Sequence, residues 1–397
     1  MRIVISLALL TITILPLHAR EIRMQERYNV GGYIRVGPTT PHFFKPHRTP
    51  RTLSKATDAE IKARGNREAA ETAQAYMTEF PGTTAMLLID REKIVFEEYQ
   101  GMGRPASEFY GMSISKSMTS LAIGKALCNG VLQNLETLAG DIVPELKISN
   151  YGKSTVRHLL TMSSGAFMTV FGGRPKYSSG MGRRPRNGKP FGGPSWPIRL
   201  GQISISDVLW GKIWEKTENK NHAAPGDVFL YRNTEPMVMS KIIERSSKMS
   251  LAAYFDKHVW QAVRGAQTGH WETDIEGTTL AMSGFQMSLK DWGRIAIWIL
   301  SELKKPGCYG DYLRQSTTTQ IKTSGIGGTA NTPFNGYGFQ WWTDHKNTPG
   351  FWGKGFAGQE LGINPKTDKV LIKFGYRSYP GVASGITDLF REWNKSN

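Results

Sequence analysis

A serine and a lysine three positions apart, Ser113 and Lys116 in the stretch SISKS, are the first pair in this sequence that can do chemistry together. A serine hydroxyl is a weak nucleophile until a neighbouring base removes its proton. Because positions i and i+3 share one face of a helix, a helix that begins at Ser113 would place the Lys116 amine beside the serine oxygen. Its first turn would also offer unpaired N–H groups and the positive end of the helix dipole to an oxyanion.

The spacing alone does not single out this pair. Ser301 and Lys304 repeat it in ILSELKKPG, near the end of a predicted helix, where no N–H groups are unpaired. A chance pair therefore remains the alternative for Ser113 and Lys116, and only the predicted helix start favours a nucleophile.

A second motif lies in PGDVFLYRNTEP, directly ahead of a predicted helix. Tyr231 is the only one of the fourteen tyrosines that is followed two places on by asparagine, Asn233. A tyrosine beside an ammonium group can pass protons readily. The alternative is a buried tyrosine and a helix-capping asparagine, and the motif alone leaves both open.

Other chemistries have less support in the sequence. It contains no His-x-His, no HExxH and no closely spaced cysteines, so no metal site is predicted. The stretch GMSIS lacks the second glycine of a nucleophile elbow, which disfavours a Ser-His-Asp triad. No phosphate-binding loop is present, and we expect neither a metal nor an organic cofactor.

The elements that must position these residues follow from hydrophobic periodicity. The stretches TTAMLLIDR and KIVFEEY predict a β-hairpin, and YGFQWWT, GQELGIN and KVLIKFGY predict three strands near the other end. Strands at both ends with helices between them predict an α/β fold of the α+β type: one antiparallel sheet flanked by helices, with a mainly helical subdomain inserted at about residues 130–285. Helices are predicted at residues 58–79, 113–127, 155–163, 235–247, 250–260, 288–303 and 384–394.

The start of the chain reads as an export signal. Residues 1–19 carry one charge, Arg2, before an apolar run that ends in the small residue Ala19, a pattern typical of a secretory signal peptide. Residues 20–57 predict an extended lead-in that wraps the surface or stays mobile, and residues 58–397 the main domain. No later segment is long and apolar enough to span a membrane, so a secreted or periplasmic protein is predicted.

The chain is strongly basic, with a formal net charge of +17. Arg and Lys are spread along the sequence without a nucleic-acid-binding motif, which disfavours a nucleic-acid partner. They are concentrated in a stretch rich in Gly and Pro, residues 171–201, which is either a clamp for an anionic group or a solvated loop.

The chain has only two cysteines. Cys128 lies in an apolar helical stripe and is expected to be a small buried hydrophobic residue. A single bridge between Cys128 and Cys308 stays open if the compartment is oxidising.

Five ordered segments resemble a known family. SISKSMTS, VRHLLTMSSG, PGDVFLYRNTEPMVMSKIIERSS, MSGFQMSLKDWGRIA and FWGKGFAGQELGINP together look like the serine β-lactamase and penicillin-binding-protein superfamily, in its class C and esterase-like branch. The nylon-oligomer (aminohexanoate-dimer) hydrolases are the most similar in style. The resemblance covers about residues 83–394.

The resemblance implies roles for particular residues. Ser113 matches the acylated serine, Lys116 the lysine that activates it and Tyr231 the tyrosine that protonates the leaving group. Asn233 matches a residue that contacts substrate or the lysine. The third motif of the family, Lys-Thr-Gly or His-Thr-Gly, falls on Gly353-Lys354-Gly355, and the N–H of Phe356 would join that of Ser113 as an oxyanion donor.

The third motif is also where this chain departs from the family. Its first position is Gly353 and its middle hydroxyl is replaced by Lys354, whereas penicillin-recognising members bind the carboxylate of the antibiotic with these groups. Lys354 is either a replacement anchor for a substrate carboxylate or a strand lysine that points to solvent. A near match, Lys322-Thr323-Ser324-Gly325, is interpreted as a decoy.

The sequence thus predicts an exported serine hydrolase that cleaves an ester or amide bond of a small-molecule or peptide-like substrate. Three alternatives stay open: a ligand-binding sensor of the same fold that has lost turnover, a true β-lactamase or D-peptidase, and a protein that binds acidic polymers through the basic loop. The sequence predicts no oligomeric state.

Overall fold

The computed structural model describes residues 40–166, 198–199, 201–211, 223–323, 333–376 and 383–396. The predicted signal peptide, residues 20–39 of the lead-in, most of the basic loop and the last two residues of the decoy motif lie outside the described residues.

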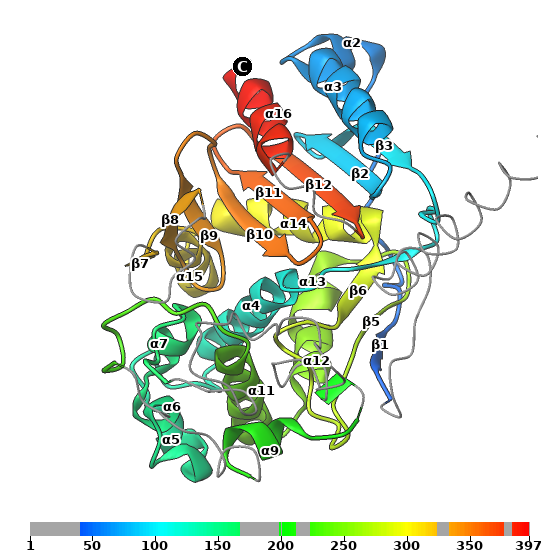
Figure 1. Cartoon of the computed structure of the whole chain (residues 1–397). Coiled ribbons are helices and arrows are strands. Elements are labelled where there is room, and N and C mark those ends of the chain that lie inside the picture. Colours follow the sequence, from blue (N-terminus) through cyan, green and yellow to red (C-terminus); the bar gives the residue numbers. More distant parts are fainter. Residues whose placement is uncertain are drawn as a thin grey trace, which may run out of the picture.

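The main sheet is built from the two ends of the described chain, as predicted (Figure 1). Its strand order is β3-β2-β12-β11-β10-β9-β8-β7, and neighbouring strands pair antiparallel. The strands are β2 (Thr83–Asp90), β3 (Lys93–Tyr99), β7 (Ile321–Lys322), β8 (Phe334–Tyr337), β9 (Trp342–His345), β10 (Phe351–Gly355), β11 (Gln359–Asn364) and β12 (Lys369–Gly375).

Helices cover both faces of this sheet, which explains why β2 is apolar along most of its length. Leu87 and Ile89 point into one hydrophobic cluster, shared with α4 (Ile114–Cys128) and α14 (Leu289–Leu303). The alternate residues Met86 and Leu88 point into the other, shared with α3 (Asn66–Glu79) and α16 (Ala383–Lys395). Side chains alternate between the faces of a strand, so a strand buried on both faces must be hydrophobic at nearly every position.

Local backbone geometry accounts for the differences from the predicted elements. The helix predicted over residues 58–79 is broken into α2 (Asp58–Lys62) and α3, because Arg64 and Gly65 have positive φ angles of 56° and 69°. The strand predicted from YGFQWWT is wrong: Gln340, with φ 66°, lies in the turn between β8 and β9. Helix α15 (Cys308–Ser316) was not predicted.

A second sheet, which was not predicted, lies beside the first. Its order is β1-β5-β6-β4, from β1 (His42–Phe44), β4 (Glu108–Tyr110), β5 (Gly269–Trp271) and β6 (Phe285–Ser288). The lead-in therefore wraps the domain over its described part: Phe44 is buried in the core, and His42 Nε2 lies 3.0 Å from Asp256 Oδ2. This sheet matters for the site because β4 leads directly into α4.

The region between the two parts of the main sheet is mainly helical, as predicted. It contains α5 (Ala139–Ile142), η1 (Pro144–Leu146), α6 (Asn150–Lys153), α7 (Val156–Leu160), α9 (Ile205–Leu209), α11 (Thr234–Ser247), α12 (Leu251–Phe255), η2 (Asp256–Trp260) and α13 (Gln261–Val263). In the described part of the chain, no helix has the length and apolar character needed to cross a membrane.

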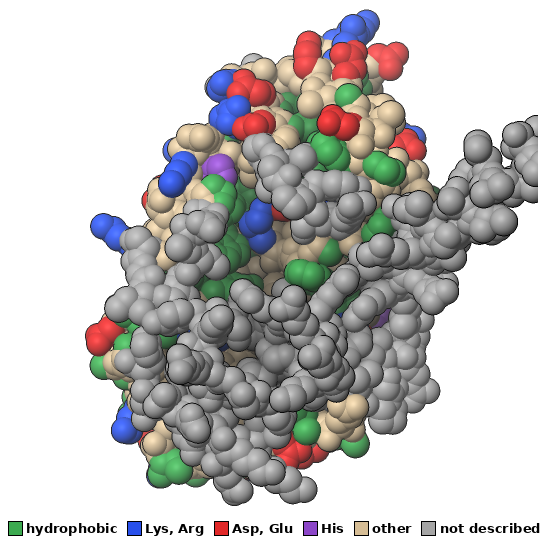
Figure 2. Space-filling view, viewed as in Figure 1, with side chains coloured by type: hydrophobic (Ala, Val, Ile, Leu, Met, Phe, Trp, Pro, Cys, Tyr) green, Lys and Arg blue, Asp and Glu red, His purple; other side chains and the backbone are tan. Residues whose placement is uncertain are grey.

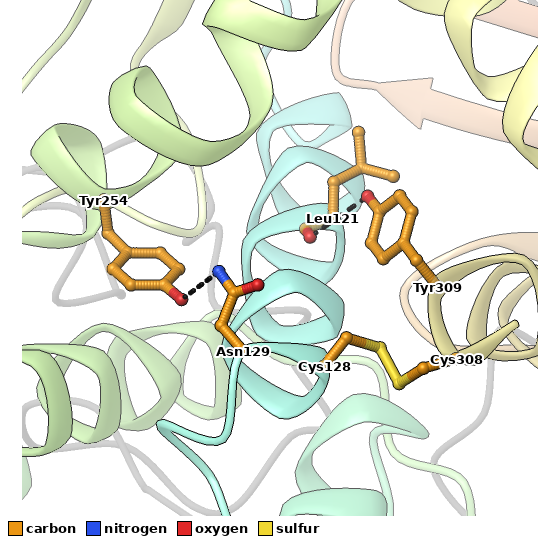
Figure 3. The surroundings of a disulfide bond; sticks show 6 residues. All are labelled: Leu121, Cys128, Asn129, Tyr254, Cys308 and Tyr309. Carbon is orange, nitrogen blue, oxygen red and sulfur yellow. Dashed lines mark hydrogen bonds between the residues drawn. A yellow bond between two sulfur atoms is a disulfide. The ribbon is translucent and has the colours of Figure 1, made fainter.

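The two cysteines form a disulfide, which corrects the expectation that Cys128 is a free hydrophobic residue (Figure 3). It joins Cys128 at the end of α4 to Cys308 at the start of α15, across 180 positions of sequence. Tyr309 supports the same contact, because its hydroxyl donates to the Leu121 carbonyl at 3.2 Å. Cys128 is only half-buried, at the last residue of α4, and no local pattern reports a partner so distant in sequence.

Candidate active site

The backbone that carries Ser113 turns sharply out of β4 into α4. Met112 has a positive φ of 49°, and Ser113 is the N-cap of the helix, which begins at Ile114. A left-handed residue other than glycine costs about 1 kcal/mol or more, so the surrounding packing must hold this turn in place. The result is a partly exposed serine at the start of an otherwise buried helix, close to the predicted arrangement.

Lys116 lies where the spacing predicts. Its Nζ donates to Ser113 Oγ at 2.8 Å and to the Met282 carbonyl at 3.0 Å, and the side chain is almost fully buried. Burial lowers the pKa of the Lys116 amine to about 7, although the charge of Glu235 acts in the opposite direction. Near neutral pH a large share of this amine is therefore unprotonated and able to accept a proton.

Tyr231 meets the same serine. The Ser113 hydroxyl is close enough to the Tyr231 phenol to affect its pKa, and Lys116 Nζ lies 5.1 Å from the centre of the tyrosine ring. Burial raises the pKa of the phenol to about 12, while the Ser113 hydroxyl acts to lower it. The Tyr231 ring stacks on Trp342 of β9, with ring centres 5.3 Å apart, which fixes its orientation.

Asn233 is buried at the N-cap position of α11, but its side chain makes no capping hydrogen bond. The structure therefore does not support the capping role that was the alternative for this residue. Two positions further on, in the first turn of α11, Glu235 is fully buried. Sequence reasoning missed Glu235, although a carboxylate in an apolar helical stretch was a signal that could have found it.

Strand β10 closes the site from the other side. A Cβ atom at Gly355 would lie 2.5 Å from the Gly111 carbonyl oxygen, which shows how closely the end of β10 approaches the turn before Ser113. A Cβ at Gly353 would meet Ile114 Cγ2 at 3.0 Å, so this position also faces α4. The first and third positions of the predicted third motif therefore lie against the serine turn with no side chains of their own.

Hydrogen bonds from two side chains fix the backbone of the turn that follows β10. Gln359 Nε2 donates to the carbonyls of Phe356 and Gly375, at 2.9 and 2.6 Å, and Lys373 Nζ donates to the Gly358 carbonyl at 2.9 Å. These bonds place the Phe356 backbone at the end of β10, next to the approach of Gly355 to the serine turn.

Lys354 does not join this group. Side chains alternate along a strand, and both neighbours of Lys354 face α4, so Lys354 points to the opposite face of the sheet. There it pairs with Glu360 on β11, and its Nζ lies 5.5 Å from the centre of the Phe334 ring. Figure 2 shows hydrophobic side chains gathered over β8 and β9 on the viewed surface.

The second Ser-x-x-Lys pair behaves differently. Ser301 Oγ donates to the Trp298 carbonyl of its own helix at 2.8 Å, and Lys304 Nζ lies 2.7 Å from Asp368 Oδ2. The two side chains thus have partners other than each other.

Comparison with known proteins agrees with this geometry. A family model described as Beta-lactamase matches residues 69–388. The chain belongs to the beta-lactamase family. The resemblance drawn from five sequence segments is confirmed, as is the α/β fold class, and the chain is a hydrolase of this family.

Individual members of the beta-lactamase family are similar over most of their length. The chain is 22% identical over 323 residues to a 6-aminohexanoate-dimer hydrolase from Paenarthrobacter ureafaciens, with 77% of this chain and 76% of the relative covered. A Bacillus anthracis structure with the same assignment gives a TM-score of 0.68 at 19% identity, over 89% of this chain and 90% of that one. EstCE1, a hydrolase with promiscuous acyltransferase activity, gives 0.61 at 13% identity, over 83% and 99%.

Proposed function

We propose that this beta-lactamase-family chain is an exported serine hydrolase that cleaves an ester or amide bond through an acyl-enzyme on Ser113. The observation that carries the proposal is the 2.8 Å hydrogen bond from the buried Lys116 amine to Ser113 Oγ, with the Tyr231 ring 5.1 Å from the same amine. A base with a pKa near 7 and a second proton carrier at one oxygen are what an acyl-transfer nucleophile requires.

The proposed reaction has two halves. Lys116, as the neutral amine, takes the Ser113 proton while Oγ attacks the carbonyl carbon, and the N–H groups of Ser113 and Phe356 bind the oxyanion. The carbon–heteroatom bond then breaks as Tyr231 protonates the leaving group, and Lys116 returns a proton to Tyr231. Water attacks the acyl-enzyme with the same groups in reversed roles and frees Ser113. Asn233 is proposed to contact the substrate.

The third motif favours neutral acyl groups over penicillins as substrates. Lys354, which the sequence offered as a carboxylate anchor, points to the far face of the sheet and pairs with Glu360. Small esters and short linear amides are therefore the proposed substrate class, and one relative is named as a hydrolase of the 6-aminohexanoate dimer. A chromogenic cephalosporin is the comparison substrate, and turnover of it at a higher kcat/KM than any ester would make the β-lactamase alternative correct.

A fluorophosphonate probe with intact-mass detection tests the nucleophile. We expect one adduct on the wild-type protein and none on Ser113→Ala, with nitrophenyl-ester turnover lost in parallel. Ser301→Ala is the matched control, because it removes the serine of the second Ser-x-x-Lys pair and should leave both readouts unchanged. An adduct that persists in Ser113→Ala, or its absence from the wild type, would refute the proposal in favour of a sensor.

The disulfide supports the proposed export, because such bonds persist mainly in oxidising compartments. Cell fractionation of the producing strain should find the protein outside the cytoplasm, with a mature N-terminus at Arg20. A protein that keeps Met1 in the cytoplasm would contradict export without touching the proposed chemistry.

A further inference from the structure

The turn between β10 and β11, residues 356–358, needs support from the rest of the fold. Ala357 and Gly358 have positive φ angles of 65° and 84°. The left-handed region is unfavourable for a residue other than glycine, so Ala357 keeps this conformation only because its surroundings impose it. Phe356 opens the turn, and its N–H is the second oxyanion donor of the proposed function. The contacts that support the turn therefore determine where this donor points.

Gln359 supports the turn from the face of the sheet that carries the nucleophile. It is the first residue of β11 and pairs with Gly355 across the hairpin, and directly paired residues share one face of a sheet. Its side chain is buried, and a Cβ at Gly355 would lie 2.8 Å from Gln359 Cβ. Because Gly355 also approaches the Gly111 carbonyl, Gln359 lies beside the contact between β10 and the serine turn.

The Gln359 carboxamide binds three backbone groups at once. Its Nε2 donates to the carbonyls of Phe356 and Gly375, at 2.9 and 2.6 Å, and its Oε1 accepts from the Gly375 N–H at 3.0 Å. A side-chain amide offers two N–H donors and a carbonyl acceptor at one end, which is what these three groups require. Gly375 is the last residue of β12. One buried side chain thus attaches the turn to the end of the next strand in the sheet.

Lys373 supports the same turn from the opposite face. Lys354, Glu360 and Lys373 are register partners across β10, β11 and β12, so the three charged side chains form one row on the face away from α4. Glu360 pairs with Lys354, and the buried Lys373 donates through Nζ to the Gly358 carbonyl at 2.9 Å. The carbonyls at the two ends of the turn are therefore bound from opposite faces of the sheet.

These contacts fix the backbone on both sides of the Phe356 N–H. Strand pairing with Gln359 holds Gly355, the residue before the donor. The Gln359 carboxamide holds the Phe356 carbonyl, which belongs to the peptide unit after the donor. Because each peptide unit is planar, fixing the groups on both sides leaves the N–H little freedom to turn away.

We propose that Gln359 is a positioning residue for the oxyanion hole: it aims the Phe356 N–H at the carbonyl oxygen of the substrate, with Lys373 as its counterpart on the opposite face. This inference rests on the proposed function, since it concerns a donor in the same reaction. A preorganised N–H stabilises the tetrahedral oxyanion, and loss of one such donor costs roughly 100–1000-fold in kcat. A donor that is displaced rather than removed should cost less.

The test compares a neutral nitrophenyl ester with its thionoester, in which sulfur replaces the carbonyl oxygen, in the wild type and in Gln359→Met. Methionine has about the size of glutamine but no N–H donor. Sulfur accepts hydrogen bonds weakly, so a displaced donor should matter mainly for the ester. We expect kcat/KM to fall by about 10–100-fold for the ester and by less than about threefold for the thionoester. Equal losses would overturn the inference, because a loosened fold slows both substrates alike.

Gln340→Met is the matched control. Gln340 is also a buried glutamine, and its Nε2 donates to the carbonyls of Leu159 and Leu160 at 3.1 and 2.8 Å. Its replacement removes the same kind of hydrogen bonds from a different turn, so the melting temperature should fall while the ratio of kcat/KM for ester over thionoester stays within about twofold of the wild type. A ratio that changes as much as in Gln359→Met would show that the effect is not specific to the oxyanion turn.

If Gln359→Met does not fold, Lys373→Met takes its place. It releases the Gly358 carbonyl, two residues after the donor, so the ester should lose about 3–10-fold more than the thionoester, and an unchanged ratio would overturn the inference. The wild-type fluorophosphonate adduct on Ser113 is measured first. Its absence would refute the proposed function, whereas its presence together with an unchanged ratio would refute only the part assigned to Gln359.

Discussion

At the scale of single residues, the site is a small group of side chains with opposed protonation tendencies around one oxygen. Burial lowers the pKa of Lys116 to about 7 and raises that of Tyr231 to about 12. One group is thereby ready to accept a proton near neutral pH while the other retains its own, a separation typical of acid and base partners.

The first prediction concerns pH. Lys116 acts as a base only when it is neutral, so kcat/KM should rise with pH through a midpoint near 7, where the lowered pKa of this amine lies. An ordinary lysine would place the rise above pH 10. A pH profile with a substrate that does not titrate gives the midpoint directly, and a midpoint near 10 would mean that the pKa of the Lys116 amine is not lowered.

The second prediction separates proton donation from nucleophilic attack. Tyr231→Phe keeps the ring that stacks on Trp342 but cannot protonate a leaving group. Amide cleavage needs that proton, so its kcat should fall by roughly 100–1000-fold. A nitrophenolate leaves without help, and its ester should lose about tenfold or less. Equal losses for the two substrates, at an unchanged melting temperature, would contradict the role proposed for Tyr231.

Sequence reasoning reached most of these residues but not their environment. Ser113, Lys116 and Tyr231 carry patterns that can be read along the chain, and the structure brings them together. The burial of Glu235 and the stacking of Trp342 on Tyr231 depend on segments far apart in sequence. The direction of Lys354 followed from strand alternation only once the register of β10 against α4 was known.

At the scale of elements, the site depends on how closely β10 approaches the turn between β4 and α4. The two glycines of β10 that face this turn differ in the room they leave. A Cβ at Gly355 would press on a backbone oxygen at 2.5 Å, whereas one at Gly353 would meet the γ2 methyl group of Ile114 at 3.0 Å.

This difference gives the third prediction. Gly355→Ala should push β10 away from the serine turn and lower kcat by roughly 100-fold, since displacements of about 1 Å have effects of this size. Gly353→Ala is the matched control and should cost less than about fivefold, because its contact at 3.0 Å requires a shift of only a few tenths of an ångström. Ester kinetics and thermal melts on both variants check the ranking, and the reverse order would show that the approach of β10 is not limiting.

Elements were predicted best where one periodicity ran uninterrupted. The β2–β3 hairpin is one example. The turn between its strands, at Arg91 and Glu92, has the two positive φ angles that a tight hairpin turn requires. Prediction failed where a single left-handed residue, such as Gln340, reverses the chain inside an apolar run. No composition signal marks such a residue when it is not glycine.

At the scale of the whole molecule, the disulfide clamps α4 at the end opposite the nucleophile. Its two cysteines are 180 positions apart, and closing so long a loop restricts the unfolded chain considerably. We therefore expect the disulfide to contribute to the stability of the fold. It should contribute little to the geometry of the site, which lies at the other end of the helix.

The fourth prediction follows from this separation. Replacing both Cys128 and Cys308 with serine should lower the free energy of unfolding by roughly 3–5 kcal/mol. At 25 °C, kcat should stay within about twofold of the wild type, because the hydrogen bonds around Ser113 are intact. Urea titration and ester kinetics measure the two quantities. A variant as stable as the wild type, or one that loses activity while folded, would contradict the prediction.

The pairing of β2 with β12 also sets the order in which this protein can be completed. The paired residues of β2 have partners on β12 that lie more than two hundred and fifty positions later in the sequence. Leu88 pairs with Leu371, and Ile89 pairs with Val370. During synthesis, β2 emerges early and can pair with β3, but its other neighbour is absent until nearly the entire chain has left the ribosome. Contacts this distant in sequence make folding slow and expose aggregation-prone surface in the meantime. The main sheet can therefore be completed only after β12, near the end of the chain, has been made.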